Sequence, residues 1–183
     1  MIIWINGTYG IGKTAVAQRL KEIFVDKSIE ILESDIYYQE MIKEMVEEAQ
    51  KTNSFPFFGG TLPQNNSALI GRFREAIQEK LTEDKIIIVD MALTREECKK
   101  GLYEYFKNEN AKMLHIILIA SEEIIKSRIR SDDSRDKQCA LENLEYNISF
   151  LKQNYPDAIR INTDNKSIDD VAYEIAHLIA CSW

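Results

Sequence analysis

Residues Asn6–Ala15 read NGTYGIGKTA and lie between the apolar run Ile2–Ile5 and a helical pattern over Thr14–Phe24. Within this stretch, Gly7–Thr14 has the spacing Gly-x-x-x-x-Gly-Lys-Thr, placed between an expected strand and an expected helix. Glycines let the backbone adopt unusual φ angles, so that successive N–H groups can converge on one anion. The helix that follows directs the positive end of its dipole toward the same place. The stretch therefore predicts a loop that binds phosphate.

The residue types after the glycines indicate a nucleotide. Lys13 supplies a movable positive charge for β- and γ-phosphates, and it is a candidate catalytic residue. Thr14 offers a hydroxyl ligand to Mg²⁺. The alternative is a glycine-rich turn that contains Lys-Thr by chance. The residues expected to bind ATP through this loop are Gly7, Thr8, Tyr9, Gly10, Ile11, Gly12, Lys13, Thr14 and Ala15.

Apolar runs alternate with helical patterns along the rest of the chain. The predicted strands are Ile2–Ile5, Ile29–Leu32, Ile86–Val89, Met113–Ile119 and Ala158–Ile161. Helices are predicted over Thr14–Phe24, Ile36–Gln50, Leu69–Leu81 and Ala140–Leu151, and from the capping residues Thr94 (with Glu97), Ser121 and Ser167. Continuous apolar strands separated by amphipathic helices are typical of parallel strands covered on both faces. The sequence predicts a three-layer α/β domain of about five parallel strands.

The composition limits the class of protein. The 183 residues suit one domain, residues 1–183, with a single sizeable core. A net charge of −7 argues against broad binding to nucleic acids or to anionic membranes. The three cysteines are scattered and form no CxxC pair, so neither a disulfide framework nor a zinc site is indicated. No apolar stretch reaches membrane-spanning length, and we expect a cytoplasmic protein with no membrane insertion and of undetermined oligomeric state.

A carboxylate lies at the carboxyl end of the second predicted strand. Glu33-Ser34-Asp35 lies where open α/β sheets bind their ligands. A carboxylate there accepts the proton of an attacking hydroxyl or orients a water bound to Mg²⁺, so Asp35 is a candidate catalytic residue. A helix cap by Ser34 or Asp35 is the alternative.

Asp90 ends the third predicted strand, IIIVD. We expect this strand beside the phosphate-loop strand, with the Asp90 carboxylate near Thr14. Thr14 and Asp90 are therefore the candidate ligands of Mg²⁺, directly or through water. Capping of the next element is the alternative for Asp90.

Three arginines, Arg128, Arg130 and Arg135, bracket the polar break at residues 131–136. Phosphoryl transfer spreads negative charge over oxygens that match the guanidinium fork. We expect a lid over about residues 128–137, with Arg128 and Arg135 as catalytic residues and Arg128 also binding the nucleotide. Cations that merely suit a helix C-terminus are the alternative.

Two classes of nucleotide-binding protein are disfavoured. Switch GTPases need Asp-x-x-Gly after a strand and Asn-Lys-x-Asp for guanine. Here Asp90 precedes Met91, Ala92 and Leu93, and residues 165–168 read Asn-Lys-Ser-Ile. Motor-type ATPases commonly place Glu after the strand Asp, where this chain has Met91.

With these residues placed, the chain resembles the small P-loop kinases, among them shikimate and gluconate kinases, nucleoside monophosphate kinases and antibiotic phosphotransferases. MIIWINGTYGIGKTAVAQRL at residues 1–20 looks closest to tunicamycin-resistance-type proteins. HIILIASEEIIKSRIRS at 115–131 looks like the strand and helix that lead into their lid. INTDNKSIDDVAYEI at 161–175 looks like their last strand and last helix.

The resemblance implies ATP and Mg²⁺, strand order 2-3-1-4-5, an arginine-bearing lid, and an adenine near residues 162–165. Glu33-Ser34-Asp35 looks like the Asp-x-Asp of shikimate kinases with Glu in the first place. Nucleoside monophosphate kinases carry Asp-Gly-x-Pro-Arg after the third strand, whereas Asp90–Arg95 lacks the Gly and Pro and shifts the Arg. A nucleoside monophosphate acceptor is therefore disfavoured.

The segment over about residues 36–74 is the expected acceptor-binding insert. Its aromatic residues and its arginines suit stacking on a ring and pairing with a phosphate or carboxylate. Equally, the aromatics suit a core and the arginines suit solvent. The residues concerned are Tyr37, Tyr38, Phe55, Phe57, Phe58, Arg72 and Arg74, with Gly59 and Gly60 as a possible hinge.

These expectations converge on an ATP-dependent phosphotransferase that acts on a hydroxyl of a small molecule such as an antibiotic, a sugar or a nucleoside-like compound. The first alternative is a nucleotide-binding resistance protein that sequesters its ligand without phosphorylating it. A weaker alternative is an ATP-hydrolysing partner protein.

Overall fold

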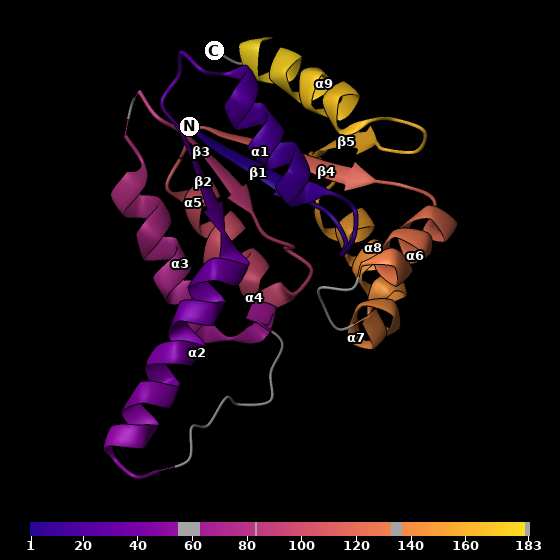
Figure 1. Ribbon diagram of the computed structural model, residues 1–183. Helices are drawn as coiled ribbons and strands as arrows, with labels where there is room; N and C mark the ends of the chain where they lie inside the picture. The colour runs from indigo at the N-terminus through magenta and orange to yellow at the C-terminus, as the bar shows by residue number, and fades with distance from the viewer. Residues whose placement is uncertain (55–62, 83, 133–136, 182–183) are drawn as a thin grey trace.

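A twisted parallel sheet organises the chain, as the computed structural model shows for residues 1–54, 63–82, 84–132 and 137–181 (Figure 1). The strands lie in the order β2-β3-β1-β4-β5. Their bounds are β1 Ile2–Asn6, β2 Ile29–Glu33, β3 Ile86–Asp90, β4 Met113–Ile119 and β5 Ile159–Asn162. The five strands and their order confirm the fold expected from the sequence. Since all pairings are parallel, the carboxyl ends of β1, β2 and β3 meet at one edge, with Glu33 and Ile5 both in register with Asp90.

Each face of the sheet is covered by helices because the strands are apolar on both sides. Ile3 and Ile5 of β1 belong to one buried cluster, and Ile2 and Trp4 belong to the other. The first cluster includes residues of α1 Lys13–Ile23, α6 Glu122–Ser131, α7 Lys137–Glu142 and α9 Ile168–Cys181. The second includes residues of α3 Ser67–Lys80, α4 Glu96–Cys98, the π-helix Lys99–Glu104, α5 Tyr105–Asn108 and α8 Leu144–Asn154. This arrangement is the predicted three-layer architecture.

The helix α2, Ser34–Lys51, extends away from the carboxyl edge of the sheet (Figure 1). It is followed by the short 3₁₀ helix Pro63–Asn65. Gly101 of the π-helix packs so closely against α3 that a Cβ there would clash with Cγ2 of Ile70. A glycine is therefore what allows this helix to approach α3.

Two predicted helix features are wrong. The helix expected over Ala140–Leu151 is two helices, because Asn143 lies in a turn between α7 and α8. The Asn143 amide donates to the carbonyl oxygen of Cys139 at 2.9 Å, a local bond that competes with regular helix. The capping box at Thr94 is absent: Arg95 occupies the N-cap of α4, and Thr94 is buried at 1% exposure.

The capping role predicted for Ser167 is confirmed. The hydroxyl of Ser167 accepts from the N–H of Asp170 at 3.1 Å, and Asp170 Oδ2 accepts from the N–H of Ser167 at 2.9 Å. This reciprocal pair fixes the start of α9. Ser121 begins α6 as predicted, but its side chain makes no capping bond.

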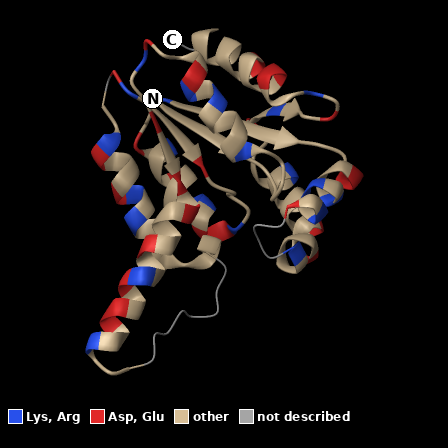
Figure 2. Cartoon of the chain, in the orientation of Figure 1, with Lys and Arg blue, Asp and Glu red and all other residues tan. Residues whose placement is uncertain are grey.

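The surface mixes charges of both signs. Figure 2 shows mainly acidic residues along α2, with basic residues among them. Over the described part of the chain, no helix combines the length and the apolar character needed to cross a membrane.

Candidate active site

The phosphate loop is anchored by the buried side chain of Asn6, the last residue of β1. Its Oδ1 accepts from the N–H of Gly7 at 2.8 Å and from the N–H of Leu93 at 3.0 Å. Its Nδ2 lies 3.1 Å from Nε2 of His115. Because Oδ1 takes both backbone donors, Nδ2 is the donor to His115. Asn6 therefore joins the start of the loop to the segment that follows β3.

The loop backbone has the conformation that the glycine positions predict. Gly10 and Gly12 have φ angles of 71° and 99°, in the left-handed region that favours glycine. A Cβ on Gly10 would also lie 3.0 Å from Cγ1 of Ile129. Gly12 is the N-cap of α1 and carries no side chain to accept from the first N–H groups of the helix. Those donors are therefore available to an anion.

Lys13 lies inside the loop, where its Nζ donates to the carbonyl oxygen of Thr8 at 3.0 Å. Burial lowers the pKa of Lys13, while the carboxylates of Asp90 and Asp35 oppose that shift. A phosphate group would add negative charge beside the ammonium and favour its protonated form.

The predicted pair of metal ligands is assembled. The hydroxyl of Thr14 donates to Oδ2 of Asp90 at 2.5 Å, so α1 and β3 contact one another directly through the two side chains. Hydroxyl and carboxylate oxygens are hard donors, and Mg²⁺ usually takes one or two such groups together with phosphate oxygens and waters. The pair fits Mg²⁺. The described residues contain no cluster of three or more acidic, His or Cys side chains that would hold a metal without a phosphate.

Asp35 lies in the first turn of α2, near the carboxyl end of β2. Burial raises the pKa of Asp35; the positive charge of Lys13 opposes this effect and the negative charge of Asp90 adds to it. A carboxylate whose proton affinity is raised suits the role of proton acceptor. The carboxylate of Glu33 has a different environment, because it accepts a hydrogen bond from Nε2 of Gln18 at 3.1 Å in an exposed position.

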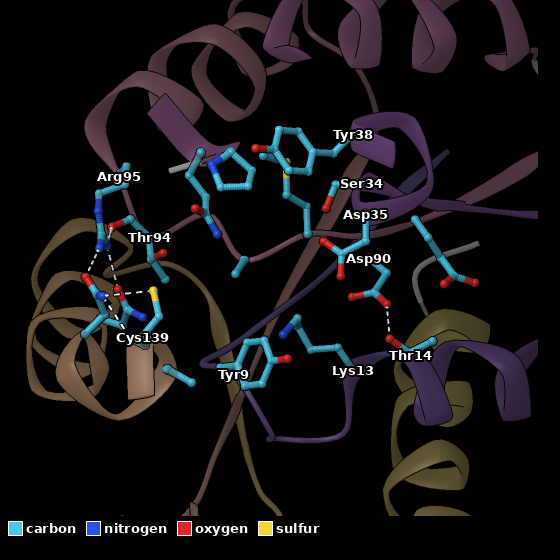
Figure 3. A pocket seen from close by; sticks show the side chains of 18 residues that line it. Tyr9, Lys13, Thr14, Ser34, Asp35, Tyr38, Asp90, Thr94, Arg95 and Cys139 are labelled. Carbon is cyan, nitrogen blue, oxygen red and sulfur yellow. Dashed lines mark hydrogen bonds between the residues drawn. The ribbon is translucent and has the colours of Figure 1, made fainter. Parts of the chain in front are cut away.

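These groups face one cavity of about 500 Å³ at the carboxyl edge of the sheet. Figure 3 shows Lys13, Asp35 and Asp90 converging on it, with Tyr9 and Tyr38 nearby. The lining residues are Tyr9, Lys13, Thr14, Glu33, Ser34, Asp35, Tyr38, Pro63, Gln64, Asp90, Met91, Ala92, Thr94, Arg95, Cys139, Ala140, Asn143 and Asn147. Five of the predicted site residues are therefore brought together: Tyr9, Lys13, Thr14, Asp35 and Asp90.

One wall of the cavity contains residues to which the sequence analysis gave no role. Arg95 follows β3, and its NH1 donates to Oδ1 of Asn147 and its NH2 to Oδ1 of Asn143, both at 2.6 Å. The guanidinium also lies 4.3 Å from the ring centroid of Tyr146. The sequence pattern that could have indicated this wall is the pair Asn143 and Asn147. Their spacing of four residues places two amides on one side of the start of a helix.

Other predicted residues lie elsewhere. Arg128 does not line the cavity: its NH1 donates to Oγ1 of Thr163 at 3.0 Å and its NH2 to the carbonyl oxygen of Thr163 at 3.2 Å. NH1 also reaches the carbonyl oxygen of Ile11, in the phosphate loop, at 3.5 Å. Arg128 therefore links this loop to the end of β5, and its contact with a nucleotide stays a prediction. Arg135 lies outside the described residues.

Of the insert residues that the structure describes, 36–54 and 63–74, Tyr38, Pro63 and Gln64 line the cavity. Tyr37 packs edge-on against Phe73, with ring centroids 5.2 Å apart. Arg72 pairs with Glu44 at 2.6 Å, and Arg74 lies 4.8 Å from the ring centroid of Tyr105. These contacts with neighbouring side chains suit the core-and-solvent interpretation, and a part for the three residues in binding the acceptor stays a prediction. Phe55, Phe57, Phe58, Gly59 and Gly60 lie outside the described residues.

Comparison with known proteins agrees with this geometry. A family model described as an AAA domain (AAA_33) matches residues 2–145. A 53-residue segment is 42% identical to a uridine kinase from Geobacillus sp. (strain WCH70). That segment is 29% of this chain and only 25% of the uridine kinase, so it leaves most of that enzyme unmatched.

Solved structures match over nearly the whole length. The tunicamycin resistance protein of Deinococcus radiodurans is 24% identical, with a TM-score of 0.67 over 97% of this chain and 94% of that one. A shikimate kinase from Bacteroides thetaiotaomicron is 17% identical, with a TM-score of 0.58 over 98% of each chain. These likenesses confirm the P-loop fold.

Proposed function

The chain belongs to the AAA-domain family, and on that premise we propose that it transfers the γ-phosphate of ATP to a hydroxyl group of a small molecule. One observation carries the proposal: a carboxylate with a raised pKa, Asp35, lines the same cavity as Lys13 and as the Thr14–Asp90 pair. The kinases among the matched proteins support the same reaction class.

The phosphate loop would hold the donor. Its backbone N–H groups and the first turn of α1 face the position where phosphate oxygens bind in such loops. Lys13 would leave the carbonyl oxygen of Thr8 for the β- and γ-phosphates. Its full charge would then stabilise the negative charge that spreads over the transferring group.

Asp35 would act on the acceptor. As the acceptor oxygen bonds to the γ-phosphorus, its proton passes to the Asp35 carboxylate. The bond between the γ-phosphorus and the bridging oxygen breaks, and ADP leaves. No other reactant is required, since the proton is released to solvent when the product departs.

Thr14 and Asp90 would hold Mg²⁺, and the ion would supply positive charge that neutralises the phosphates of the donor. Arg128 would contact the nucleotide from the side of β5, because its guanidinium already joins Thr163 to the loop residue Ile11. Arg135 is proposed to add charge from the lid, as the sequence predicts.

Labelled ATP, incubated with the protein and a panel of sugars, hydroxy acids, nucleosides and antibiotics, tests the proposal. We expect labelled product, and Asp35→Asn should lower its rate by about 10²- to 10⁴-fold while ATP affinity stays unchanged. Asp26→Asn, an exposed carboxylate outside the cavity, is the matched control and should keep full activity.

Three results would contradict the proposal. Intact turnover in Asp35→Asn would remove the proton acceptor. A ligand that binds without any labelled product would favour sequestration, the alternative consistent with the likeness to a tunicamycin resistance protein. Hydrolysis of ATP that no acceptor stimulates would favour an ATPase.

A further inference from the structure

Arg95 is a rigidly held cation in the wall of the active-site cavity. Its NH1 donates to the carbonyl oxygen of Thr94 at 2.7 Å and to Oδ1 of Asn147 at 2.6 Å, and its NH2 donates to Oδ1 of Asn143 at 2.6 Å. The ring of Tyr146 lies against the guanidinium. The neighbouring residue Thr94 and the start of α8, residues 143–147, therefore hold one side chain in place, as a preorganised binding group requires.

The charge of Arg95 is not neutralised by the groups that hold it. All three oxygen partners belong to neutral amides. Over residues 1–54, 63–82, 84–132 and 137–181, no carboxylate forms an ion pair with Arg95. The nearest acid in sequence, Glu96, pairs instead with Lys99 and Lys100. A half-buried guanidinium without a counterion favours an anionic ligand.

Arg95 also keeps hydrogen-bonding capacity for such a ligand. A guanidinium has five N–H donors. Three of them are engaged within the part of the chain that the structure describes, which leaves two. Two donors of one guanidinium match the two oxygens of a carboxylate or two oxygens of a phosphate.

The position of Arg95 separates it from the phosphate loop. Figure 3 shows Arg95 at the opposite side of the cavity from Thr14 and Asp90, and Asp35 lies on the side of Asp90. We infer that the acceptor carries an oxyanion, a carboxylate or a phosphate, which Arg95 binds while the acceptor hydroxyl faces Asp35. The inference rests on the proposed function, since it names the class of acceptor for the same cavity.

Asn147→Asp tests the inference because it changes charge and keeps shape. The aspartate retains the oxygen that accepts from NH1, so the contact with Arg95 is preserved. The added negative charge neutralises Arg95 and should repel an anionic ligand. Because Asn147 itself lines the cavity, its new charge would also act directly on an anion, so Arg95→Met, which removes the guanidinium without adding a negative charge, is the second variant that must lose the preference. Asn154→Asp is the matched control, since Asn154 ends the same helix outside the cavity, beside Lys99.

The probes are two pairs that differ in charge: gluconate with sorbitol, and uridine 5′-phosphate with uridine. Each is titrated calorimetrically into the full chain saturated with Mg²⁺ and a non-hydrolysable ATP analogue, so that the phosphate loop is already occupied. We expect an anionic probe to bind at least tenfold more tightly than its neutral partner. Asn147→Asp should remove that preference, and Asn154→Asp should keep it. The pair that shows the preference distinguishes a carboxylate from a phosphate.

Equal binding of the charged and neutral members, or an unchanged preference in Asn147→Asp, overturns the inference. A weakened affinity of Asn147→Asp for the ATP analogue also overturns it, because Arg95 would then serve the donor. Arg95→Met should behave as Asn147→Asp does, whereas Arg74→Met, which removes a cation outside the cavity, should not. An anion preference without labelled product from ATP would contradict the proposed phosphotransfer alone.

Discussion

The two walls of the cavity are built in different ways. The phosphate wall is one continuous stretch, Gly7–Ala15, and it presents mainly backbone N–H groups at the start of α1. The opposite wall consists of side chains from separate segments: Arg95 after β3, and Asn143 and Asn147 at the junction of α7 and α8. A wall made of backbone depends on glycine conformations and one lysine. A wall made of side chains changes its ligand with a single substitution. Under the proposed function, the difference would let one fold keep its donor and vary its acceptor.

Among substitutions in the two walls, the largest expected effect comes from removing the full charge of Lys13 in the phosphate wall. Lys13→Ala should lower kcat by about 10²- to 10³-fold, because a preorganised group aimed at developing charge is lost. The change in kcat is measured from the steady-state transfer of label from ATP. Lys21→Ala, an exposed lysine on the same helix, should change nothing. Activity retained by Lys13→Ala would mean that backbone groups alone bear the transferring phosphate.

The opposite wall should respond in a different kinetic constant. Asn143→Ala removes one of the two amides that hold Arg95, and hydrogen bonds to charged groups contribute about 1.5–3 kcal/mol. We expect KM for the acceptor to rise about tenfold or more, with KM for ATP unchanged. Asn154→Ala serves as the control on the same helix. If both KM values rise together, the two walls are not independent.

The pH dependence of turnover tests whether Asp35 is the proton acceptor. Its carboxylate must be ionised to accept a proton, and burial raises its pKa. As pH falls below that raised pKa, kcat/KM for the acceptor should fall by about tenfold per pH unit. The decline should begin at a higher pH than the ordinary pKa of Asp, 3.8. A profile that is flat down to pH 4 would exclude Asp35 as the base.

The contrast between the walls also explains what the sequence could and could not predict. The phosphate loop was predictable because Gly7, Gly12, Lys13 and Thr14 are close in sequence and their spacing follows from the geometry of a strand-to-helix turn. The strands were predictable because they are apolar on both faces. Asp35 and Asp90 were predictable by their position, since parallel strands end at the same edge of the sheet.

The position of Arg95 in the cavity wall was not predictable in the same way. Its partners Asn143 and Asn147 lie about fifty residues further along the chain, and the turn at Asn143 that brings them into place interrupts a pattern that indicates one helix. Hydrogen bonds between side chains of distant segments leave no periodic signal. The packing of Tyr37 against Phe73 and the pairing of Arg72 with Glu44 likewise depend on how α2 and α3 pack, which composition alone does not determine.

The smallest expected effect lies outside both walls. Ser167→Ala removes the side chain that caps α9 and should lower the free energy of unfolding by about 1 kcal/mol. Ser167→Thr keeps a capping hydroxyl and should restore most of that stability. Both variants should keep the KM values of the wild type, because α9 packs on α1 through residues such as Ile175 and does not line the cavity. Urea unfolding measures the first effect and label transfer measures the second. A change in either KM would show that packing of α9 on α1 controls the phosphate wall, which would then depend on more than its own backbone.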